Sequence, residues 1–278
     1  TDLRLAMVAG EASGDLLASM LLSGLRARWP QLQAAGIGGP KMAQHGFDAW
    51  WPSDKLAVRG YVEVLRHYRE IAGIRRALGK RILREKPAAF IGVDAPDFNL
   101  GLEEKLRARG MRTIHFICPS IWAWRANRVD KIRRAVDHML CVFPFEPQLL
   151  EQHGIAATFV GHPMADAIPL DDVDKAKART ALRMPTLRPV VALLPGSRRS
   201  EIEAHAQTWL ETAQRLYRHI GDLEFVLPVA PGLRTLIDDA VARHGQQLPL
   251  TVVDGRSHDA LAACDVTLIA SGTATLEA

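Results

Sequence analysis

The chain of 278 residues has few cysteines, no long apolar run and no large excess of charge of either sign. Cys118, Cys141 and Cys264 are far apart and odd in number, which excludes a disulfide framework and paired metal ligands and favours a reducing cytosol. No apolar run approaches the roughly 18 residues of a membrane-spanning helix, and we expect no signal peptide. With 35 Lys and Arg against 31 Asp and Glu, and 48% hydrophobic residues, the composition fits a globular protein and excludes disorder and collagen.

Metal-ligand patterns are also scarce. The histidines show no H-E-x-x-H or similar spacing. Asp172 and Asp174 spell the D-x-D pattern that holds a cation on a nucleotide sugar, but they lie in a polar linker before a helical segment rich in Lys and Arg. Acidic residues are common at the amino end of such a helix. We therefore expect no metal site.

Positive charge is concentrated in one segment. Between Arg59 and Lys86, nine Lys or Arg residues face three Glu residues, a net charge of +6 that leaves −2 for the rest of the chain. Apolar residues recur at intervals of three and four over residues 61–84, which predicts a basic amphipathic helix. Its apolar stripe could pack on the core, as in an ordinary surface helix, or the helix could dock on anionic lipid or an acylated substrate.

Alternating strand-like and helical patterns predict an α/β protein with parallel sheets covered on both faces. The expected strands are residues 3–9, 89–93, 113–118, 139–143 and 157–160, and then 190–194, 224–227, 250–253 and 266–270. A polar stretch and two prolines separate these series, so we expect domains at residues 1–164 and 165–278. The sequence stops inside an expected helix, so we also expect the carboxyl-terminal end to be incomplete.

Candidate site residues follow the expected strands, because ligands of open parallel sheets bind beyond the carboxyl ends of the strands. After the first strand, Glu11, Ser13 and Asp15 open a helix whose exposed N–H groups favour an anion or a polar ligand. The glycines at residues 36–39 lack the spacing of a dinucleotide fingerprint, and that signal is weak.

The strand at residues 89–93 ends in an acidic turn. Asp94 would lie at the strand tip, where a carboxylate can accept a proton or orient a hydroxyl group, while Asp97 or Asn99 could cap the next helix. The choice between Asp94 and Asp97 stays open, and we favour Asp94 because it is nearer the strand end.

The next turn is aromatic. It carries four candidate residues for the wall of a sugar or acyl site: Ser120, Trp122, Trp124 and Arg125. Two tryptophans in one loop either pack on the domain core as a lid or contact a ligand.

Two turns of the second half begin helices and suit a nucleotide diphosphate. Backbone N–H groups, hydroxyl groups and a guanidinium would meet there, and an acid in the first turn of the last helix could accept hydrogen bonds from ribose. The candidate residues are Gly196, Ser197, Arg198, Ser271, Gly272, Thr273 and Glu277.

These turns fall into six motifs: G-E-A-S-G-D at 10–15, D-A-P-D-F-N at 94–99, P-S-I-W-A-W-R at 119–125, G-H-P at 161–163, L-P-G-S-R at 194–198 and A-S-G-T-A-T-L-E at 270–277. In order and spacing the chain resembles the lipid A disaccharide synthase family. The resemblance implies a GT-B type fold, with two Rossmann-like domains whose parallel sheets face across a crevice. The first domain would bind the acceptor on the membrane side, and the second would bind the UDP-sugar donor.

The resemblance also implies an activity. Family members join UDP-2,3-diacylglucosamine to 2,3-diacylglucosamine 1-phosphate (lipid X), giving the β-1′,6-linked disaccharide and UDP with inversion. The family's essential aspartate falls on Asp94, and its UDP-binding arginine falls on Arg198. We expect no metal or other cofactor, no nucleic-acid partner, a homodimer, and a cytoplasmic location on the inner membrane of a Gram-negative bacterium, with residues 61–84 facing anionic lipid.

Two alternatives stay open. The first is another two-domain enzyme of this type, either a UDP-N-acetylglucosamine 2-epimerase or a glycosyltransferase with a soluble acceptor. Such an enzyme would not need the basic amphipathic helix or the tryptophan loop. The second is a nucleotide-binding module without catalysis.

Overall fold

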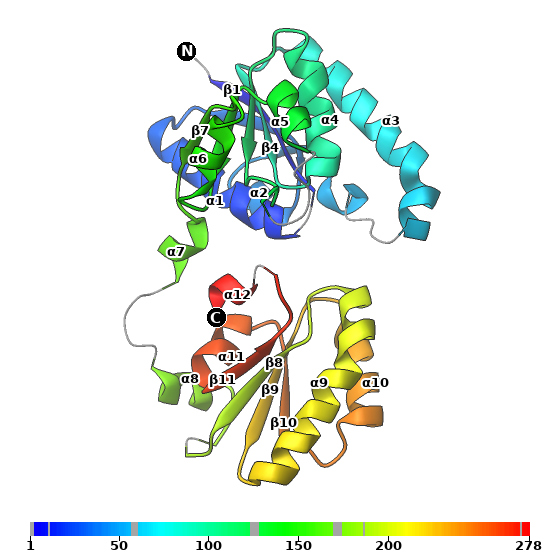
Figure 1. Ribbon diagram of the computed structural model, residues 1–278, viewed down its shortest axis with the longest axis vertical. Helices are drawn as coiled ribbons and strands as arrows, with labels where there is room; N and C mark the ends of the chain where they lie inside the picture. The colour runs from blue at the N-terminus through cyan, green and yellow to red at the C-terminus, as the bar shows by residue number, and fades with distance from the viewer. Residues whose placement is uncertain are drawn as a thin grey trace. The chain divides into compact units, whose positions relative to one another are not determined.

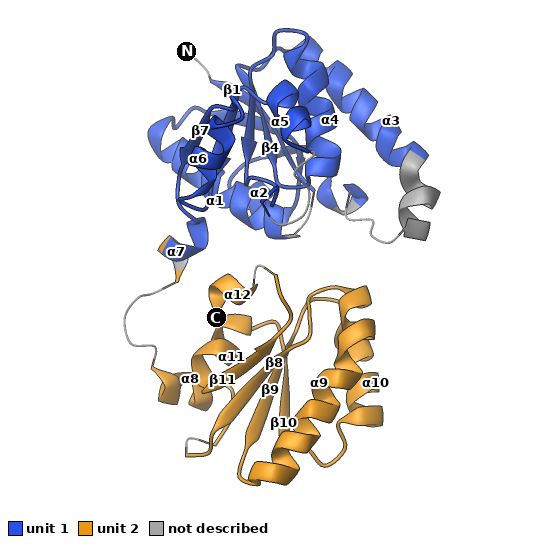
Figure 2. Ribbon diagram, in the orientation of Figure 1, with its two compact units in different colours: residues 1–165 blue, residues 166–278 orange. Residues whose placement is uncertain are grey.

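The computed structural model describes residues 3–10, 12–56, 61–122, 128–168, 174–185, 187–272 and 274–278. The chain divides into two compact units, Thr1–Ala165 (unit 1) and Asp166–Ala278 (unit 2), shown in Figures 1 and 2. Each unit contains a fully parallel sheet flanked by helices. The expected α/β class with parallel sheets is confirmed.

Unit 1 is built on a seven-stranded sheet in the order β3-β2-β1-β4-β5-β6-β7. Its strands are β1 (Arg4–Ala9), β2 (Gln33–Gly38), β3 (Asp48–Pro52), β4 (Ala89–Val93), β5 (Thr113–Phe116), β6 (His138–Cys141) and β7 (Ala157–Phe159). Its helices are α1 (Ala12–Arg28), α2 (Pro40–Gln44), the short 3-10 helix η1 (Ser53–Leu56), α3 (Tyr61–Glu85), α4 (Pro96–Arg107), α5 (Val129–Ala135) and α6 (Glu146–Glu151). Helix α7 (Pro163–Ala167) contains the boundary between the units.

The strand order creates a switch point between β1 and β4. Strands β2 and β3 continue from β1 toward one edge, and β4 to β7 continue toward the other. Apart from the exposed Arg4 at the start of β1, both central strands are apolar and buried, as expected for strands covered by helices on both faces. In open α/β sheets the crevice for ligands lies outside the carboxyl ends of the strands at such a point. For unit 1 this means the turns after Ala9 and Val93.

Strands β2 and β3 were missing from the sequence prediction. Strand β2 has the sequence QAAGIG, in which alanine and glycine have little strand propensity. Its Gly36 has a φ of 145°, and a Cβ there would overlap the carbonyl oxygen of Met7 on β1. The pairing of β2 with β3 shifts register at this residue. Gly36 therefore permits the close pairing of β2 with β1, while added side chains at Gly38 and Gly39 would instead meet Met42 and Asp15.

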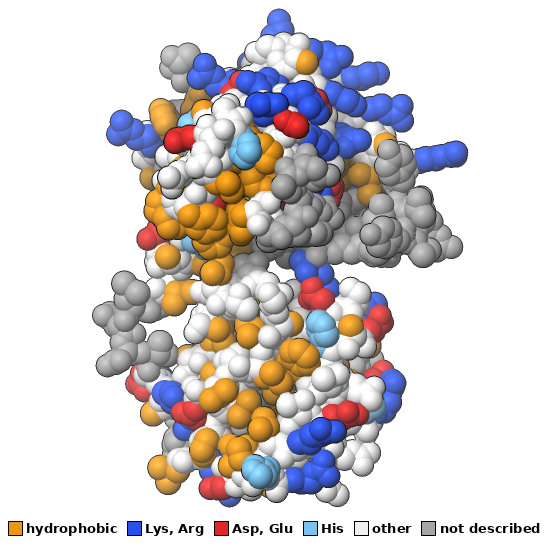
Figure 3. Space-filling model, in the orientation of Figure 1, with side chains coloured by type: hydrophobic (Ala, Val, Ile, Leu, Met, Phe, Trp, Pro, Cys, Tyr) orange, Lys and Arg blue, Asp and Glu red, His pale blue; other side chains and the backbone are white. Residues whose placement is uncertain are grey.

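Helix α3 is the basic amphipathic helix expected at residues 61–84. The side chains of residues 61–68 lie outside the described part of the chain. In the remainder, Ile71, Ile74, Leu78 and Ile82 pack against a core that includes Leu102 of α4. This half of the apolar stripe is thus an ordinary core face, and Lys and Arg side chains gather over this part of unit 1 (Figure 3). Among the described residues, no helix has both the length and the apolarity needed to cross a bilayer.

Unit 2 has a four-stranded parallel sheet in the order β10-β9-β8-β11. The strands are β8 (Val190–Leu194), β9 (Glu224–Val229), β10 (Leu250–Asp254) and β11 (Val266–Ile269), and the helices are α8 (Lys175–Ala181), α9 (Arg199–Ile220), α10 (Arg234–His244), α11 (Ser257–Ala263) and α12 (Ala274–Glu277). Its switch point lies between β8 and β11, whose ends are aligned because Leu194 pairs with Ile269. The turns after these two strands are therefore neighbours.

Candidate functional site

Asp94 lies at the switch point of unit 1, directly after the last residue of β4. Asp94 and Ala95 both have left-handed backbone conformations, with φ angles of 50° and 42°. Such conformations are strained for residues other than glycine and persist only where the surrounding structure enforces them. One constraint is the hydrogen bond from the Asp94 N–H to the Phe116 carbonyl oxygen, 3.0 Å away at the end of β5.

The start of α1 lies against this turn. A Cβ at Gly14 would lie 4.0 Å from the Asp94 Cβ, and a Cβ at Gly10 would lie 3.3 Å from the Ala95 Cβ. Ser13 is in the first turn of the same helix and is partly exposed. The structure therefore brings Ser13 and Asp94 together at the carboxyl ends of β1 and β4. The small residues Gly10 and Gly14 permit the start of α1 to approach the turn at Asp94 closely. Glu11 lies outside the described residues.

Asn99 ties the ends of the two central strands together. Its fully buried amide nitrogen, Nδ2, is 2.8 Å from the Asp94 carbonyl oxygen, 3.3 Å from that of Val93 and 3.5 Å from that of Val8. Asn99 does not cap α4 through its side chain, because that helix begins after Ala95 with no side-chain cap. We therefore assign Asn99 to the floor of the site, not to its surface.

A pocket of about 220 Å³ opens at this edge. Its lining includes Asp94, Cys118, Ser120 and Arg128. Asp94 and Ser120, which the sequence placed after two different strands, thus line one cavity. Burial raises the pKa of the Cys118 thiol well above its ordinary value, so this group does not supply a nucleophile.

Arg128 was not among the residues singled out from the sequence. It directly precedes α5, and its side chain is 16% exposed and pairs with the carboxylate of Asp97. Asp97 itself is 82% exposed, and it does not line the pocket. The structure thus separates the two acids of the turn, since Asp94 faces the pocket and Asp97 pairs with a neighbouring cation. Only the tertiary fold brings Arg128 to this turn, so sequence spacing could not reveal it.

Asp15 supports the neighbouring helix. Its side chain is buried, and its carboxylate accepts the N–H groups of Gly39 at 2.8 Å, Lys41 at 2.9 Å and Met42 at 3.1 Å. These are donors at the start of α2, which otherwise has no side-chain cap. Asp15 of α1 therefore caps the amino end of α2.

Trp122 is part of an exposed aromatic cluster. Its ring meets Phe143 and Phe145 edge-on, with centroid distances of 6.2 and 5.0 Å, and Phe143 stacks on Phe145. The tryptophan is 40% exposed and Phe145 is 49% exposed, so the cluster offers apolar surface to a ligand. Trp124 and Arg125 lie outside the described residues.

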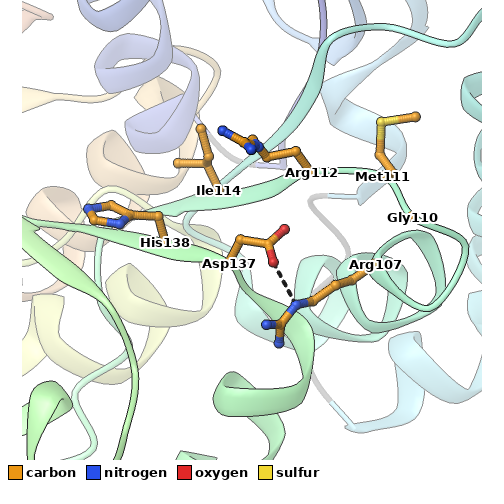
Figure 4. A pocket seen from close by; sticks show the side chains of 7 residues that line it. All are labelled: Arg107, Gly110, Met111, Arg112, Ile114, Asp137 and His138. Carbon is orange, nitrogen blue, oxygen red and sulfur yellow. Dashed lines mark hydrogen bonds and ion pairs between the residues drawn. The ribbon is translucent and has the colours of Figure 1, made fainter.

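A larger hollow of about 610 Å³ lies at the amino-terminal ends of strands β5 and β6, on the side of the sheet away from Asp94 (Figure 4). It is lined by residues that precede or begin β5 and β6, including Arg112 and His138. The ion pair between Arg107 and Asp137, 2.8 Å long, forms part of its wall. Because ligands of parallel sheets bind at the carboxyl ends of the strands, its size does not make it the candidate active site.

In unit 2, residues 196–198 form the turn between β8 and α9. Gly196 has a φ of 138°, and a side chain there would overlap Glu201. The Glu201 carboxylate accepts the N–H groups of Ser197 at 2.9 Å and Arg198 at 3.2 Å and pairs with the Arg198 guanidinium. Partial burial alone would raise the pKa of Glu201, but Arg198 and the Ser197 N–H outweigh it and hold the pKa below its ordinary value. This turn already holds one anionic group.

The turn after β11 lies beside it. The Ala270 N–H donates to the Leu194 carbonyl oxygen at 2.9 Å, which joins the ends of the two strands. Ser271 and Gly272 follow in an exposed turn, and Glu277 pairs with His258 at 3.2 Å. Thr273 lies outside the described residues.

Metal ligands do not gather in the described part of the chain, where no three His, Cys, Asp or Glu side chains are grouped to hold an ion. The D-x-D pattern lies partly outside that part. Its second acid, Asp174, accepts the Lys177 N–H at 2.8 Å and caps α8.

Two Rossmann-like units, each with polar turns at the switch point of a parallel sheet, define the GT-B type architecture. Solved structures of this type include a UDP-N-acetylglucosamine 2-epimerase from Neisseria meningitidis bound to UDP-GlcNAc, with a TM-score of 0.67 and 11% identity over 97% of this chain and 78% of that one. The kitacinnamycin glycosyltransferase has a TM-score of 0.62 and 13% identity, covering 99% of this chain and 77% of that one. At these identities the likeness establishes the fold.

The family model described as lipid-A-disaccharide synthetase matches residues 5–278. The lipid-A-disaccharide synthase of Albidiferax ferrireducens is 57% identical over 99% of this chain and 71% of its own length. That of Paraburkholderia phymatum is 56% identical over 100% of this chain and 72% of its own length. The chain belongs to the lipid-A-disaccharide synthase family, and it is a glycosyltransferase that forms the lipid A disaccharide. The epimerase and the non-catalytic module gain no support from these relatives.

Proposed function

We propose that the enzyme joins UDP-2,3-diacylglucosamine to 2,3-diacylglucosamine 1-phosphate in one inverting step. The 6-hydroxyl oxygen of the acceptor attacks the anomeric carbon of the donor, the bond from that carbon to the diphosphate oxygen breaks, and UDP leaves from the opposite face. The donor linkage is α and the product linkage is β, which a single in-line displacement explains. The hydroxyl proton passes to Asp94.

One observation carries the assignment of the base: Asp94 is held in a strained turn at the switch point, and it lines a pocket with Ser120 and Arg128. A carboxylate is a weak base toward an alcohol, so the proton transfers late, as the new bond forms. Fixing the carboxylate in one orientation is then the main contribution that the protein makes at this atom.

We assign the donor to unit 2. Leaving UDP gains negative charge, and the backbone N–H groups and the guanidinium of residues 196–198, which hold the Glu201 carboxylate here, would stabilise it in place of that carboxylate. Ser271, Gly272 and Glu277 would complete the nucleotide contacts. Because fixed donors supply the positive charge, we propose that the reaction needs no metal ion. The homodimer and the cytoplasmic inner-membrane location implied by the family resemblance stay predictions.

We propose that the aromatic cluster of Trp122, Phe143 and Phe145 receives acyl or sugar surface of the acceptor. The basic face of α3 would then bring the enzyme to anionic lipid. Its exposed cations include Arg76, Lys80 and Arg84, and each basic residue near an anionic surface adds about 1 kcal/mol of attraction.

The reaction is tested by mass spectrometry of lipids after incubation with both substrates, with and without a chelator. We expect a disaccharide 1-phosphate that depends on both substrates and forms equally with chelator. The base is tested by comparing Asp94→Asn with Asp97→Asn. We expect the first to lower kcat by about 10²- to 10⁴-fold and the second to change it little. A normal kcat for Asp94→Asn would remove Asp94 from this role.

Membrane docking is tested by co-sedimentation with vesicles of anionic or neutral lipid. The triple variant Arg76→Glu, Lys80→Glu, Arg84→Glu should lose binding to anionic vesicles. A matched triple in unit 2, Arg215→Glu, Arg218→Glu, Arg243→Glu, makes the same change of net charge and should retain it. Equal loss in both triples would show that only net charge matters.

A further inference from the structure

A cluster of buried polar side chains lies beneath Asp94 and has no part in the steps described above. Asn99, Glu103 and His115 are each 0% exposed, and His115 Nδ1 is 2.8 Å from Glu103 Oε1. Asn99 and Glu103 are four residues apart on α4, so they share one face of that helix. Burial of charged groups is costly unless they are paired, so the presence of this cluster between α4 and the sheet needs an explanation.

Gly92 makes room for the cluster. It is the partner of His115 in the pairing of β4 with β5. A Cβ at Gly92 would overlap Glu103 Oε1 and would lie 3.0 Å from the Asn99 Cβ. The Glu103 carboxylate and the Asn99 side chain therefore both rest on the backbone of β4, two residues before Asp94.

The cluster is connected to Asp94 in three ways. The Asn99 amide donates to the Asp94 carbonyl oxygen at 2.8 Å. The second connection is electrostatic. Burial alone would lower the pKa of His115, but Glu103, through its charge and its hydrogen bond, and the charge of Asp94 outweigh it and raise the pKa. The backbone also links Asp94 to His115, because the Asp94 N–H donates to the carbonyl oxygen of Phe116, the residue after His115, at 3.0 Å.

Within the described residues, three polar atoms of the cluster have no hydrogen-bond partner: Asn99 Oδ1, Glu103 Oε2 and His115 Nε2. Each such atom costs stability, and an apolar core of the same shape would avoid that cost. Where a protein keeps a destabilising polar group in its core, the site of function is the expected place.

Resting on the proposed role of Asp94, we propose that Glu103 and His115 are positioning residues: their ion pair fixes Asn99 against β4, and Asn99 fixes the left-handed turn that aims the Asp94 carboxylate. The pair does not touch substrate. Its contribution is the orientation of the base, so its loss lowers kcat and leaves substrate binding intact.

The test begins with Glu103→Gln, which keeps the size of the side chain and removes its charge. We expect kcat to fall about tenfold or more, with KM for both substrates unchanged. The matched control is Thr113→Val on the same strand as His115. Thr113 is equally buried and donates a 2.8 Å hydrogen bond to the Ala135 carbonyl oxygen, but it lies at the other end of β5. This variant should lower Tm and keep kcat per folded molecule.

A double-mutant cycle separates this proposal from the role of Asp94 itself. If Glu103 acts through Asp94, then Glu103→Gln has no further effect on kcat in the Asp94→Asn background. Equal losses in both backgrounds would overturn the positioning role. If Asp94→Asn is inactive while Glu103→Gln has normal kcat, only the positioning proposal fails. If Asp94→Asn has normal kcat, the base assignment fails and the positioning role falls with it.

If Glu103→Gln does not fold, two variants of His115 still test the proposal. In His115→Asn, the amide nitrogen can replace Nδ1 as donor to Glu103, whereas His115→Leu offers no donor. We expect His115→Asn, which keeps the hydrogen bond but not the charge, to lower kcat less than His115→Leu, which keeps neither, at equal KM. Equal kcat in the two folded variants would contradict the proposal.

Discussion

The Glu103 carboxylate on α4 packs directly against Gly92 on β4, so that no side chain fits at position 92. A Cβ there would overlap Glu103 Oε1 and press on Asn99. Glycine in the interior of a central strand weakens the strand, because it adds chain entropy and packs no side chain. In this sheet that loss makes room for a charged pair close to the proposed base.

The first prediction concerns this contact. Gly92→Ala should lower the free energy of unfolding by about 2 kcal/mol, as for an overpacked core. It should also lower kcat, because it displaces Asn99. The control is Gly24→Ala in α1, where nothing lies within 4 Å of the added methyl group, and it should stabilise the protein by about 1 kcal/mol. Urea unfolding measures both, and a stable, fully active Gly92→Ala would contradict the packing described.

The second prediction concerns Asp15. Because its carboxylate holds three N–H groups at the start of α2, Asp15→Ala should destabilise unit 1 by about 2 kcal/mol. Thermal unfolding monitored by circular dichroism measures the loss. A variant with unchanged unfolding but a raised KM for the acceptor would instead support the acceptor-side role expected from the sequence.

The third prediction concerns the proposed diphosphate site. The Glu201 carboxylate holds the N–H groups and the guanidinium that leaving UDP would use. Glu201→Gln removes this competing charge and should tighten UDP binding about fivefold, or roughly 1 kcal/mol. Calorimetric titration measures the affinity. Exposed Glu203, one turn away from the site on α9, provides the control, since Glu203→Gln should bind UDP normally. Weaker binding by Glu201→Gln would show that Glu201 organises the site for UDP.

The fourth prediction concerns Asp265, which joins three segments of unit 2. Its carboxylate accepts from Lys175 Nζ at 2.7 Å, Arg179 Nη2 at 2.6 Å and the Val190 N–H at 2.7 Å. Burial alone would raise the pKa of Asp265, but these partners outweigh it and lower the pKa. The stabilisation is therefore complete above the unfolded pKa of about 3.9 and disappears as the pH falls through the lower folded value.

Asp265→Asn should accordingly lower the free energy of unfolding by about 2 kcal/mol at pH 7, a modest figure because the Asp265 side chain is 36% exposed. The difference from the unsubstituted protein should shrink as the pH falls below about 4. Denaturant unfolding across this pH range is the measurement. Asp239→Asn, at an exposed position of the same unit, should show neither effect. A difference that grows in acid would reverse the sign of the linkage.

The sequence predicted the parts of this fold that depend on local pattern. Strands β4 and β8 occur at the predicted residues, since both are uninterrupted apolar runs. Asp94 at a strand end follows from the general geometry of parallel sheets. The sequence did not predict strand β2, because its Gly36 serves a contact with β1 that only the tertiary structure reveals.

The rest of the candidate site depends on contacts between distant segments. Glu103 has the position of an ordinary helix residue and His115 that of an ordinary strand residue, and only their approach across Gly92 makes them a pair. One signal was present in the sequence, because a glycine inside an apolar strand often marks a close approach. Arg128 gave no such signal, since its contact with Asp97 spans thirty-one residues.

The hydrogen bonds of Asn99 have a consequence for how the enzyme could accommodate lipids of different size. One amide group donates to carbonyl oxygens from two adjacent strands, so a movement that separates the ends of β1 and β4 must also break these hydrogen bonds. The ends of β1 and β4 below the proposed base should therefore be rigid, and their backbone amide hydrogens should exchange slowly with solvent. Acyl chains of different length would then be accommodated by the sides of the site, such as the exposed aromatic rings. These rings can change position without moving the reacting atoms.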